Sequence, residues 1–128
     1  MNIAVQGLWH LGSVTSISLA SLGFKVLAID NDPKVIEDFQ RDLLPVYEPG
    51  LEALFIENKN KITFSTNFEK LRNVDLLWVA YDTPVDKRDN ADIDFVIKNI
   101  KQSINYLPND ALIVISSQLP VGSIKKLE

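Results

Sequence analysis

Two glycines near the N-terminus have the spacing that points most directly to chemistry. Gly7 and Gly12 lie between a predicted buried strand at residues 3–5 and a predicted helix that ends near Gly23. In a G-x-G-x-x-G turn, the first glycine makes the turn, the second lets a diphosphate approach the backbone, and the third permits close helix–strand packing. Gly7 and Gly12 fill the first and third places, and Trp9 stands in the second. The segment predicts a diphosphate site at a helix N-terminus, where unpaired N–H groups and the helix dipole favour anions.

Asp30 indicates which dinucleotide this site would take. It ends a predicted second strand at residues 24–29 and follows Gly12 at close to the usual spacing of about 20 residues. A carboxylate there can accept hydrogen bonds from an adenosine ribose and would repel a 2′-phosphate. Asn31 and Asp32 come next, so no arginine follows to hold such a phosphate. We therefore expect NAD rather than NADP; the alternative is that the glycines only shape a turn and that Asp30 only caps a loop.

The elements that must position these residues alternate between strand and helix. Apolar runs predict further strands at residues 62–64, 74–81 and 112–115, and apolar positions at helical spacing predict helices at 14–22, 33–39, 51–56, 68–71 and 93–107. Strands that are apolar along their whole length are typical of a parallel sheet covered on both faces. The sequence predicts an α/β fold, a doubly wound parallel sheet of the Rossmann-like dinucleotide-binding type. Its expected core includes Phe39, Phe55, Trp78 and Phe95.

Length and composition limit the function classes. The 128 residues, 46% of them hydrophobic, suit one domain with one core. Thirteen basic against 17 acidic residues leave a net charge of −4, which argues against a nucleic-acid partner and favours a small molecule or a protein. The absence of cysteine excludes a thiol nucleophile within these residues. No apolar run approaches the roughly 20 residues of a membrane helix, and a cytoplasmic protein is expected.

Several motifs stand in the order and spacing of one known family. The chain resembles, over essentially its whole length, the N-terminal NAD-binding domain of the UDP-glucose/GDP-mannose dehydrogenases. The Tyr-Glu-Pro-Gly-Leu segment, together with a later Pro-Val-Gly, is a specific combination. The matching positions are residues 1–5, Gly7, Gly12, Asp30, Lys34, residues 46–51, Thr83, Pro84, Ala91, Asp92 and residues 120–122.

The resemblance implies an activity that this chain would perform only in part. Family members oxidise the C6 hydroxyl of a nucleotide-sugar to a carboxylate in two NAD-dependent steps, through a covalent intermediate on a cysteine in a later domain. Residues 1–128 would be the NAD-binding domain of a longer enzyme, expected to be a homodimer. A predicted helix start at Ser123, five residues before the last one, agrees with this. The nucleotide-sugar would bind through the missing C-terminal domains, and the fragment alone is predicted to be inactive.

By position, the resemblance also assigns site residues. The backbone of His10 and Leu11 would face the pyrophosphate, Asp30 and Lys34 would hold the adenosine ribose, and Thr83 would lie near the nicotinamide. No catalytic or metal-binding residue is expected within the chain. The expected cofactor-binding residues are Gly7, Trp9, His10, Leu11, Gly12, Asp30, Lys34, Tyr81, Thr83 and Gln118.

Three departures from the family pattern fall at the expected cofactor crevice. Trp9 replaces a glycine, Tyr81 and Asp82 replace a small residue and a glycine, and Gln118 replaces a threonine that belongs to the active site. Each change adds bulk where the cofactor needs space. Two alternatives therefore stay open: a divergent, non-catalytic member that senses a nucleotide or supports assembly, and a different NAD-dependent alcohol dehydrogenase family with a similar first domain.

Two further residue patterns have ordinary interpretations. His10 is the single histidine and invites a general-base role, but with no nucleophile nearby it is predicted to line the crevice. The aspartates between residues 82 and 94 lack the central glycine and terminal glutamate of a calcium loop, so a solvated loop is expected.

Overall fold

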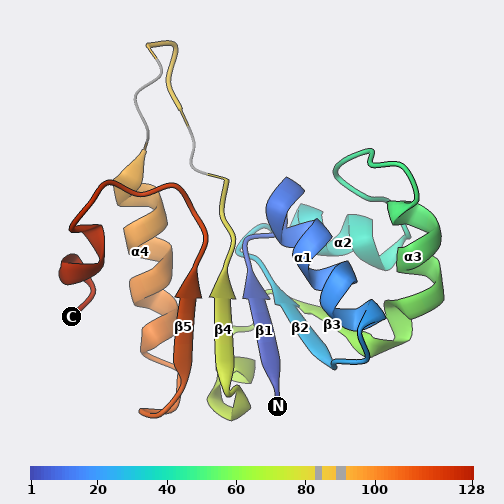
Figure 1. Cartoon of the computed structure of the whole chain (residues 1–128), viewed down its shortest axis with the longest axis horizontal. Coiled ribbons are helices and arrows are strands. Elements are labelled where there is room, and N and C mark those ends of the chain that lie inside the picture. The colour runs from blue at the N-terminus through green and yellow to red at the C-terminus, as the bar shows by residue number, and fades with distance from the viewer. Residues whose placement is uncertain (83–84, 89–91) are drawn as a thin grey trace.

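The computed structural model describes residues 1–82, 85–88 and 92–128. Its five strands form one parallel sheet in the order β3-β2-β1-β4-β5, as Figure 1 shows. This is the strand order of the first five strands of a dinucleotide-binding sheet, and it confirms the predicted doubly wound α/β fold. The strands are β1 (Ile3–Gln6), β2 (Val26–Ile29), β3 (Ile62–Ser65), β4 (Leu76–Val79) and β5 (Leu112–Ile115).

Helices cover both faces of the sheet (Figure 1). On one face α1 (His10–Ser21), α2 (Pro33–Gln40) and α3 (Leu51–Asn58) pack over a core that includes Val5, Phe39 and Phe55. On the other face α4 (Ile93–Ile104) packs over a core that includes Leu77 and Val79. The 3-10 turns are η1 (Lys59–Lys61), η2 (Phe68–Asn73) and η3 (Ser123–Lys126). No helix in the described ranges is both long and apolar enough to cross a bilayer.

Local sequence signals account for where the helices begin and end. The side chain of Asp32 accepts a hydrogen bond from the Lys34 N–H ahead of α2, with proline at the first helical position, as predicted. Asn67 caps η2 in the same way. Gly23, with φ +100°, follows the end of α1 in the left-handed conformation that glycine adopts without strain. These caps confirm the predicted starts and stops.

Some predicted elements are shorter in the structure. The strand predicted at residues 74–81 spans only Leu76–Val79, although the Ala80 N–H still donates to the Gln6 carbonyl oxygen. The helix predicted to reach residue 107 ends at Ile104. Ser123 is not an N-cap: it opens a single 3-10 turn after Gly122, and its hydroxyl donates to the Pro120 carbonyl oxygen.

Of the four expected core aromatics, Phe95 is exposed, whereas Trp78 is partly buried and packs against the core. Phe95 is 42% exposed in the first turn of α4, where its ring meets Tyr81 edge-on at a centroid distance of 5.7 Å. Trp78 is half-buried on β4, and its indole N–H donates to Ser116. Phe39 and Phe55 are buried as predicted and form an aromatic cluster with Phe64.

Candidate functional site

The candidate site lies where neighbouring parallel strands end and the chain departs to opposite faces. β1 pairs with β2 on one side and with β4 on the other, and Gln6 is in register with Val79. The segment after β1 enters α1 on one face of the sheet, whereas the segment after β4 leads to α4 on the other (Figure 1). A crevice at such a switch point is where open α/β sheets bind their ligands.

Gly7 and Gly12 pack against each other at the turn between β1 and α1. Gly7 has φ +91°, and a Cβ there would lie 2.7 Å from Cδ1 of Tyr81. A Cβ on Gly12 would lie 1.6 Å from the Gly7 carbonyl oxygen. Both glycines are therefore required by conformation or by space, and α1 begins directly against the end of β1.

Trp9 fills the second glycine place without disturbing the turn. Its φ of −87° does not lie in the left-handed region that favours glycine. The side chain is 60% exposed, so the indole lies out toward solvent rather than inside the turn. Trp9 immediately precedes α1 but provides no side-chain cap for it.

The first turn of α1 presents backbone N–H groups at the switch point. The first intrahelical bond runs from the Ser13 N–H to the Trp9 carbonyl, so the N–H groups of His10, Leu11 and Gly12 have no acceptor within the helix. The His10 N–H donates to Oδ2 of Asp82, at 3.0 Å. A carboxylate from the segment after β4 thus stands at the place predicted for a pyrophosphate.

Asp30 is buried beneath the glycine turn, with 4% of its surface exposed. One carboxylate oxygen accepts the Leu8 N–H at 2.8 Å, and the other accepts the Asp32 N–H at 2.9 Å. Asp30 therefore ties the turn after β1 to the loop after β2. Each oxygen keeps capacity for a second acceptor bond, so a role toward a ribose stays a prediction beside this structural one.

Lys34 lies four residues after Asp30, at the start of α2. Its ammonium group is 2.5 Å from Oδ1 of Asp38, one helical turn further along, and the side chain is largely exposed. The structure thus places Lys34 in a surface pair on its own helix. Its predicted contact with the ribose remains a prediction.

A buried hydrogen-bond network lies on the α4 side of the turn. The Gln6 amide nitrogen donates to the Tyr81 hydroxyl at 3.0 Å and to the Asn99 carbonyl at 3.1 Å. The Ser103 hydroxyl donates to the Gln6 amide oxygen at 2.6 Å, and Asn31 donates to the Asn99 side chain. The network joins the ends of β1 and β2 to α4 and holds Tyr81 in place.

Burial raises the pKa of the Tyr81 hydroxyl well above its ordinary value. The hydrogen bond from Gln6 lowers this pKa, and the negative charge of Asp30 raises it further. Tyr81 is therefore a neutral hydroxyl at any physiological pH. Its ring lies against Gly7, so the bulk expected at this position packs into the fold.

His10 lines a concavity beside α1, and its place at the cofactor crevice stays a prediction. Its Nε2 atom is 2.7 Å from Oε1 of Glu48, in the Tyr-Glu-Pro-Gly-Leu segment, and both side chains are substantially exposed. The concavity has a volume of about 490 Å³ and is lined by His10, Val14, Glu48, Pro49, Gly50, Leu51 and Leu54. The Glu48 carboxylate couples the start of α1 to the segment that leads into α3.

The other predicted site residues lie after β4 and β5. Thr83 lies outside the described residues. Gln118 is exposed in the segment that follows β5. Next to it, the Ser117 hydroxyl oxygen is buried and has no hydrogen-bond partner within residues 1–82, 85–88 and 92–128.

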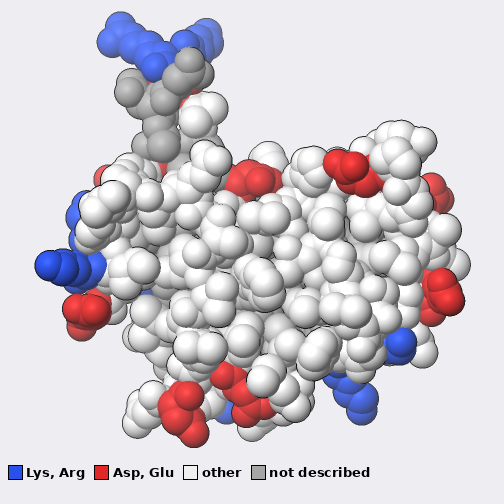
Figure 2. Space-filling view, viewed as in Figure 1, with Lys and Arg blue, Asp and Glu red and all other residues white. Residues whose placement is uncertain are grey.

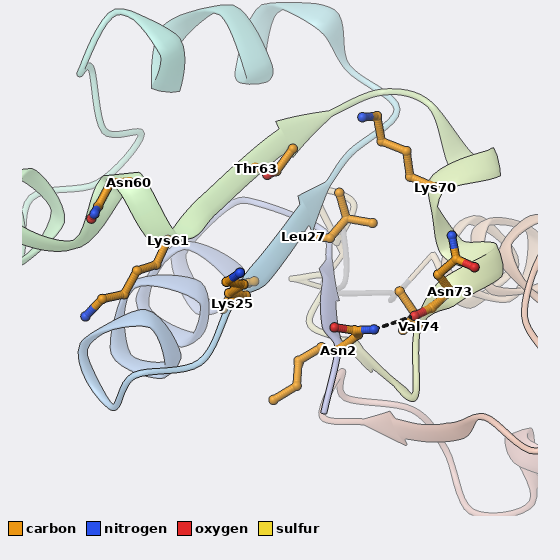
Figure 3. A pocket seen from close by; sticks show the side chains of 11 residues that line it. Asn2, Lys25, Leu27, Asn60, Lys61, Thr63, Lys70, Asn73 and Val74 are labelled. Carbon is orange, nitrogen blue, oxygen red and sulfur yellow. Dashed lines mark hydrogen bonds between the residues drawn. The ribbon is translucent and has the colours of Figure 1, made fainter.

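A second concavity lies at the opposite end of the sheet. It has a volume of about 630 Å³ and includes Lys25, Lys61 and Lys70 in its lining (Figure 3). Lys61 donates to the Ala20 carbonyl and to Asn58, so it stabilises the end of α1. This concavity is at the amino ends of the strands, away from the turn and from Asp30. In Figure 2 acidic side chains lie on the upper edge, where the strands of Figure 1 end, and also on the lower edge.

The site fits NAD on several structural grounds. The turn excludes any Cβ at Gly7 and Gly12, the N-terminus of α1 lies at the switch point, and Asp30 follows β2. The predictions missed Gln6, Asn99 and Ser103. The sequence signals that could have predicted this network are Gln6 in the otherwise apolar strand β1 and the polar residues Asn99 and Ser103, four positions apart on α4. Asp82 was noted for its bulk and as part of an expected solvated loop, not as a partner of the α1 backbone.

Comparison with known proteins agrees with this geometry. The sequence model of the UDP-glucose/GDP-mannose dehydrogenase family, NAD binding domain, matches residues 1–128. The chain is 35% identical over 132 residues to uncharacterized protein MJ1054 of Methanocaldococcus jannaschii, covering 100% of this chain and 15% of that protein. It is 32% identical over 126 residues to the UDP-glucose 6-dehydrogenase YwqF of Bacillus subtilis, covering 96% of this chain and 29% of that one.

The fold is also similar to that of a solved relative. Against the UDP-D-ManNAc dehydrogenase of Pyrococcus horikoshii, the TM-score is 0.90 at 26% identity, covering 99% of this chain and 31% of that one. The chain thus spans less than a third of the length of each of these relatives. Because the family model matches every residue, the chain belongs to the UDP-glucose/GDP-mannose dehydrogenase family and corresponds to its NAD binding domain.

Proposed function

We propose that this chain holds NAD across the carboxyl ends of β1, β2 and β4 for a nucleotide-sugar 6-dehydrogenase. The observation that carries the proposal is the contact between Gly12 and the Gly7 carbonyl, which brings the N-terminus of α1 directly to the end of β1. This places the N–H groups of His10, Leu11 and Gly12 at the switch point, where they can hold a diphosphate. When bound, NAD supplies the hydride acceptor for oxidation of the sugar C6 alcohol.

The remaining side chains orient the cofactor rather than react. Asp30 can accept a ribose hydroxyl while it holds the turn through Leu8, and its charge disfavours the 2′-phosphate of NADP. Lys34 would have to leave Asp38 to reach the ribose. Tyr81 stays neutral, and its ring packs against Gly7.

The sugar substrate and the thiol belong to the rest of the proposed enzyme. The 128 residues contain no cysteine, so a covalent step on sulfur needs a residue outside them. The relatives named UDP-glucose 6-dehydrogenase and UDP-D-ManNAc dehydrogenase support a nucleotide-sugar as the substrate class. A homodimeric full-length enzyme in the cytoplasm completes the proposal, and light scattering on the full-length protein tests the dimer.

Calorimetric titration with NAD and NADP tests the cofactor site. We expect NAD to bind this chain and NADP to bind at least about 10-fold more weakly, because the Asp30 carboxylate faces the ribose. Asp30→Asn should reduce the difference between the NAD and NADP affinities. Thermal unfolding shows whether the variant stays folded. Failure of NAD and ADP to bind either the chain or the full-length protein at millimolar concentration would sink the proposal.

One observation favours a second candidate, a non-catalytic member that senses a nucleotide. The Asp82 carboxylate accepts a hydrogen bond from the His10 N–H, which is one of the groups that would bind the diphosphate. This candidate predicts nucleotide binding without turnover. NADH production by the full-length protein on any nucleotide-sugar would decide for the enzyme.

A further inference from the structure

Asp82 forms a long-range contact with the first residue of α1. Its Oδ2 atom accepts the His10 N–H at 3.0 Å, although the two residues are 72 positions apart in the sequence. His10 is the first residue of a 12-residue helix, and its N–H is among those that point out of the helix at the crevice. A carboxylate therefore occupies a position that suits one oxygen of a diphosphate.

No carboxylate in the first turn, and no side-chain cap, stabilises the N-terminus of α1. Trp9 precedes the helix without capping it through its side chain, and the first turn of α1 contains no acidic residue. The nearby Glu48 carboxylate contacts the His10 imidazole instead of the backbone. Asp82 thus supplies the negative charge that the N-terminal end of the helix dipole favours.

Tyr81 explains why Asp82 stays in this position. The Tyr81 side chain is buried, its hydroxyl accepts a hydrogen bond from Gln6, and its ring lies against Gly7. The residue after Tyr81 is consequently held beside the start of α1. Asp82 itself is exposed, so a rotation of its side chain can release the His10 N–H without opening the core.

We propose that Asp82 is an internal substitute for the cofactor diphosphate and sets the affinity of this chain for NAD. The inference rests on the proposed cofactor site. Two negative groups cannot share the same N–H donors, so NAD binds only when Asp82 has moved away. The apparent dissociation constant equals the intrinsic one divided by the fraction of molecules in which the carboxylate has released the helix. The ligand class that Asp82 opposes is a diphosphate, whatever nucleoside carries it.

Replacing Asp82 by asparagine tests this directly, because asparagine keeps the size and removes the charge. We expect Asp82→Asn and Asp82→Gly to bind NAD and ADP roughly 3- to 10-fold more tightly than the unchanged chain in calorimetry. Adenosine, which has no phosphate, should bind all three proteins equally. The matched control is Asp94→Asn, which removes the same charge from the first turn of α4 and should leave every affinity unchanged.

Thermal unfolding gives a second readout. Without ligand, Asp82→Asn should lower Tm by about 2–4 °C, because α1 loses a favourable charge at its N-terminus. The increase in Tm caused by saturating ADP should in turn be larger for this variant. A shift of the His10 backbone amide signal in the NMR spectrum should accompany the substitution.

The outcomes separate the two proposals. Equal NAD and ADP affinities in the unchanged chain and in both Asp82 variants would overturn the role of Asp82 and leave the cofactor site standing. Tighter binding of adenosine as well would also overturn it, since the effect would not depend on the diphosphate. Failure of every protein to bind NAD or ADP would overturn the cofactor site and, with it, the role of Asp82.

Discussion

Gly12 packs against the carbonyl oxygen of Gly7 so closely that a Cβ on Gly12 would lie 1.6 Å from that oxygen. Gly12 lies within α1, and its φ is not in the left-handed region. The requirement for glycine at this position therefore comes from space alone. The contact determines the distance between the N-terminus of α1 and the end of β1, so we expect it to affect both the stability of the domain and the geometry of the candidate site.

Gly12→Ala should consequently be among the most damaging single changes in the chain. We expect a loss of about 3–5 kcal/mol in the free energy of unfolding, because the helix must shift away from β1. Gly23→Ala is the matched control, since a Cβ there meets nothing within 4 Å and the cost is only that of φ +100°. In urea denaturation, Gly23→Ala should lower the free energy of unfolding by about 1 kcal/mol. Equal losses in both variants would contradict the steric explanation.

Tyr81→Phe should lower stability by about 1 kcal/mol at neutral pH, because the Gln6 amide loses one acceptor within a buried network. The variant keeps the ring that lies against Gly7, so the fold should be unchanged in its circular dichroism spectrum. A loss below about 0.3 kcal/mol in urea denaturation would show that water or Asn99 replaces the bond.

The same hydroxyl should make stability depend on pH in the alkaline range. Burial raises the pKa of Tyr81 in the folded chain, whereas the unfolded chain titrates near the ordinary value of about 10. The unfolded state then binds fewer protons above pH 10, so the contribution is fully present below about pH 10 and is lost as pH rises further. The stability difference between Tyr81→Phe and the unchanged chain, measured in urea at pH 8 and pH 11, should shrink or reverse. A difference independent of pH would contradict the raised pKa.

Asp30→Asn should cost about 2–3 kcal/mol in the free energy of unfolding. The buried carboxylate accepts one N–H at each oxygen, from Leu8 and from Asp32, and an asparagine side chain offers only one acceptor oxygen. Asp32→Asn is a useful comparison, because it caps α2 at an exposed position and should cost no more than about 1 kcal/mol. Thermal unfolding of both variants measures the contrast, and similar values would argue against a structural role for Asp30.

His10→Gln should leave catalysis by the proposed full-length enzyme within about 10-fold of the unchanged rate. His10 faces the Glu48 carboxylate in an exposed pair, and general-base catalysis contributes about 100- to 10,000-fold where a residue performs it. Steady-state NADH production measures kcat for both proteins. A loss of 100-fold or more in kcat, with stability unchanged, would make His10 a proton acceptor in the reaction.

The sequence by itself determined the class of the fold and predicted where the candidate site lies. Runs of apolar residues identified the buried strands, because strands covered on both faces carry few polar side chains. The spacing of Gly7, Gly12 and Asp30 located the turn and the end of β2, because local backbone geometry restricts the residues that fit there. Both patterns depend on residues close together in the sequence, so they can be recognised without a structure.

Only the tertiary structure decided which groups meet at that site. The bond from His10 to Asp82 joins residues 72 positions apart, and the bond from Gln6 to Tyr81 joins residues 75 positions apart. Such contacts depend on β4 lying beside β1, and hydrophobic periodicity does not specify the order of strands. The exposure of Phe95 and the outward indole of Trp9 were settled the same way, because burial depends on which neighbours cover a side chain and not on its own hydrophobicity.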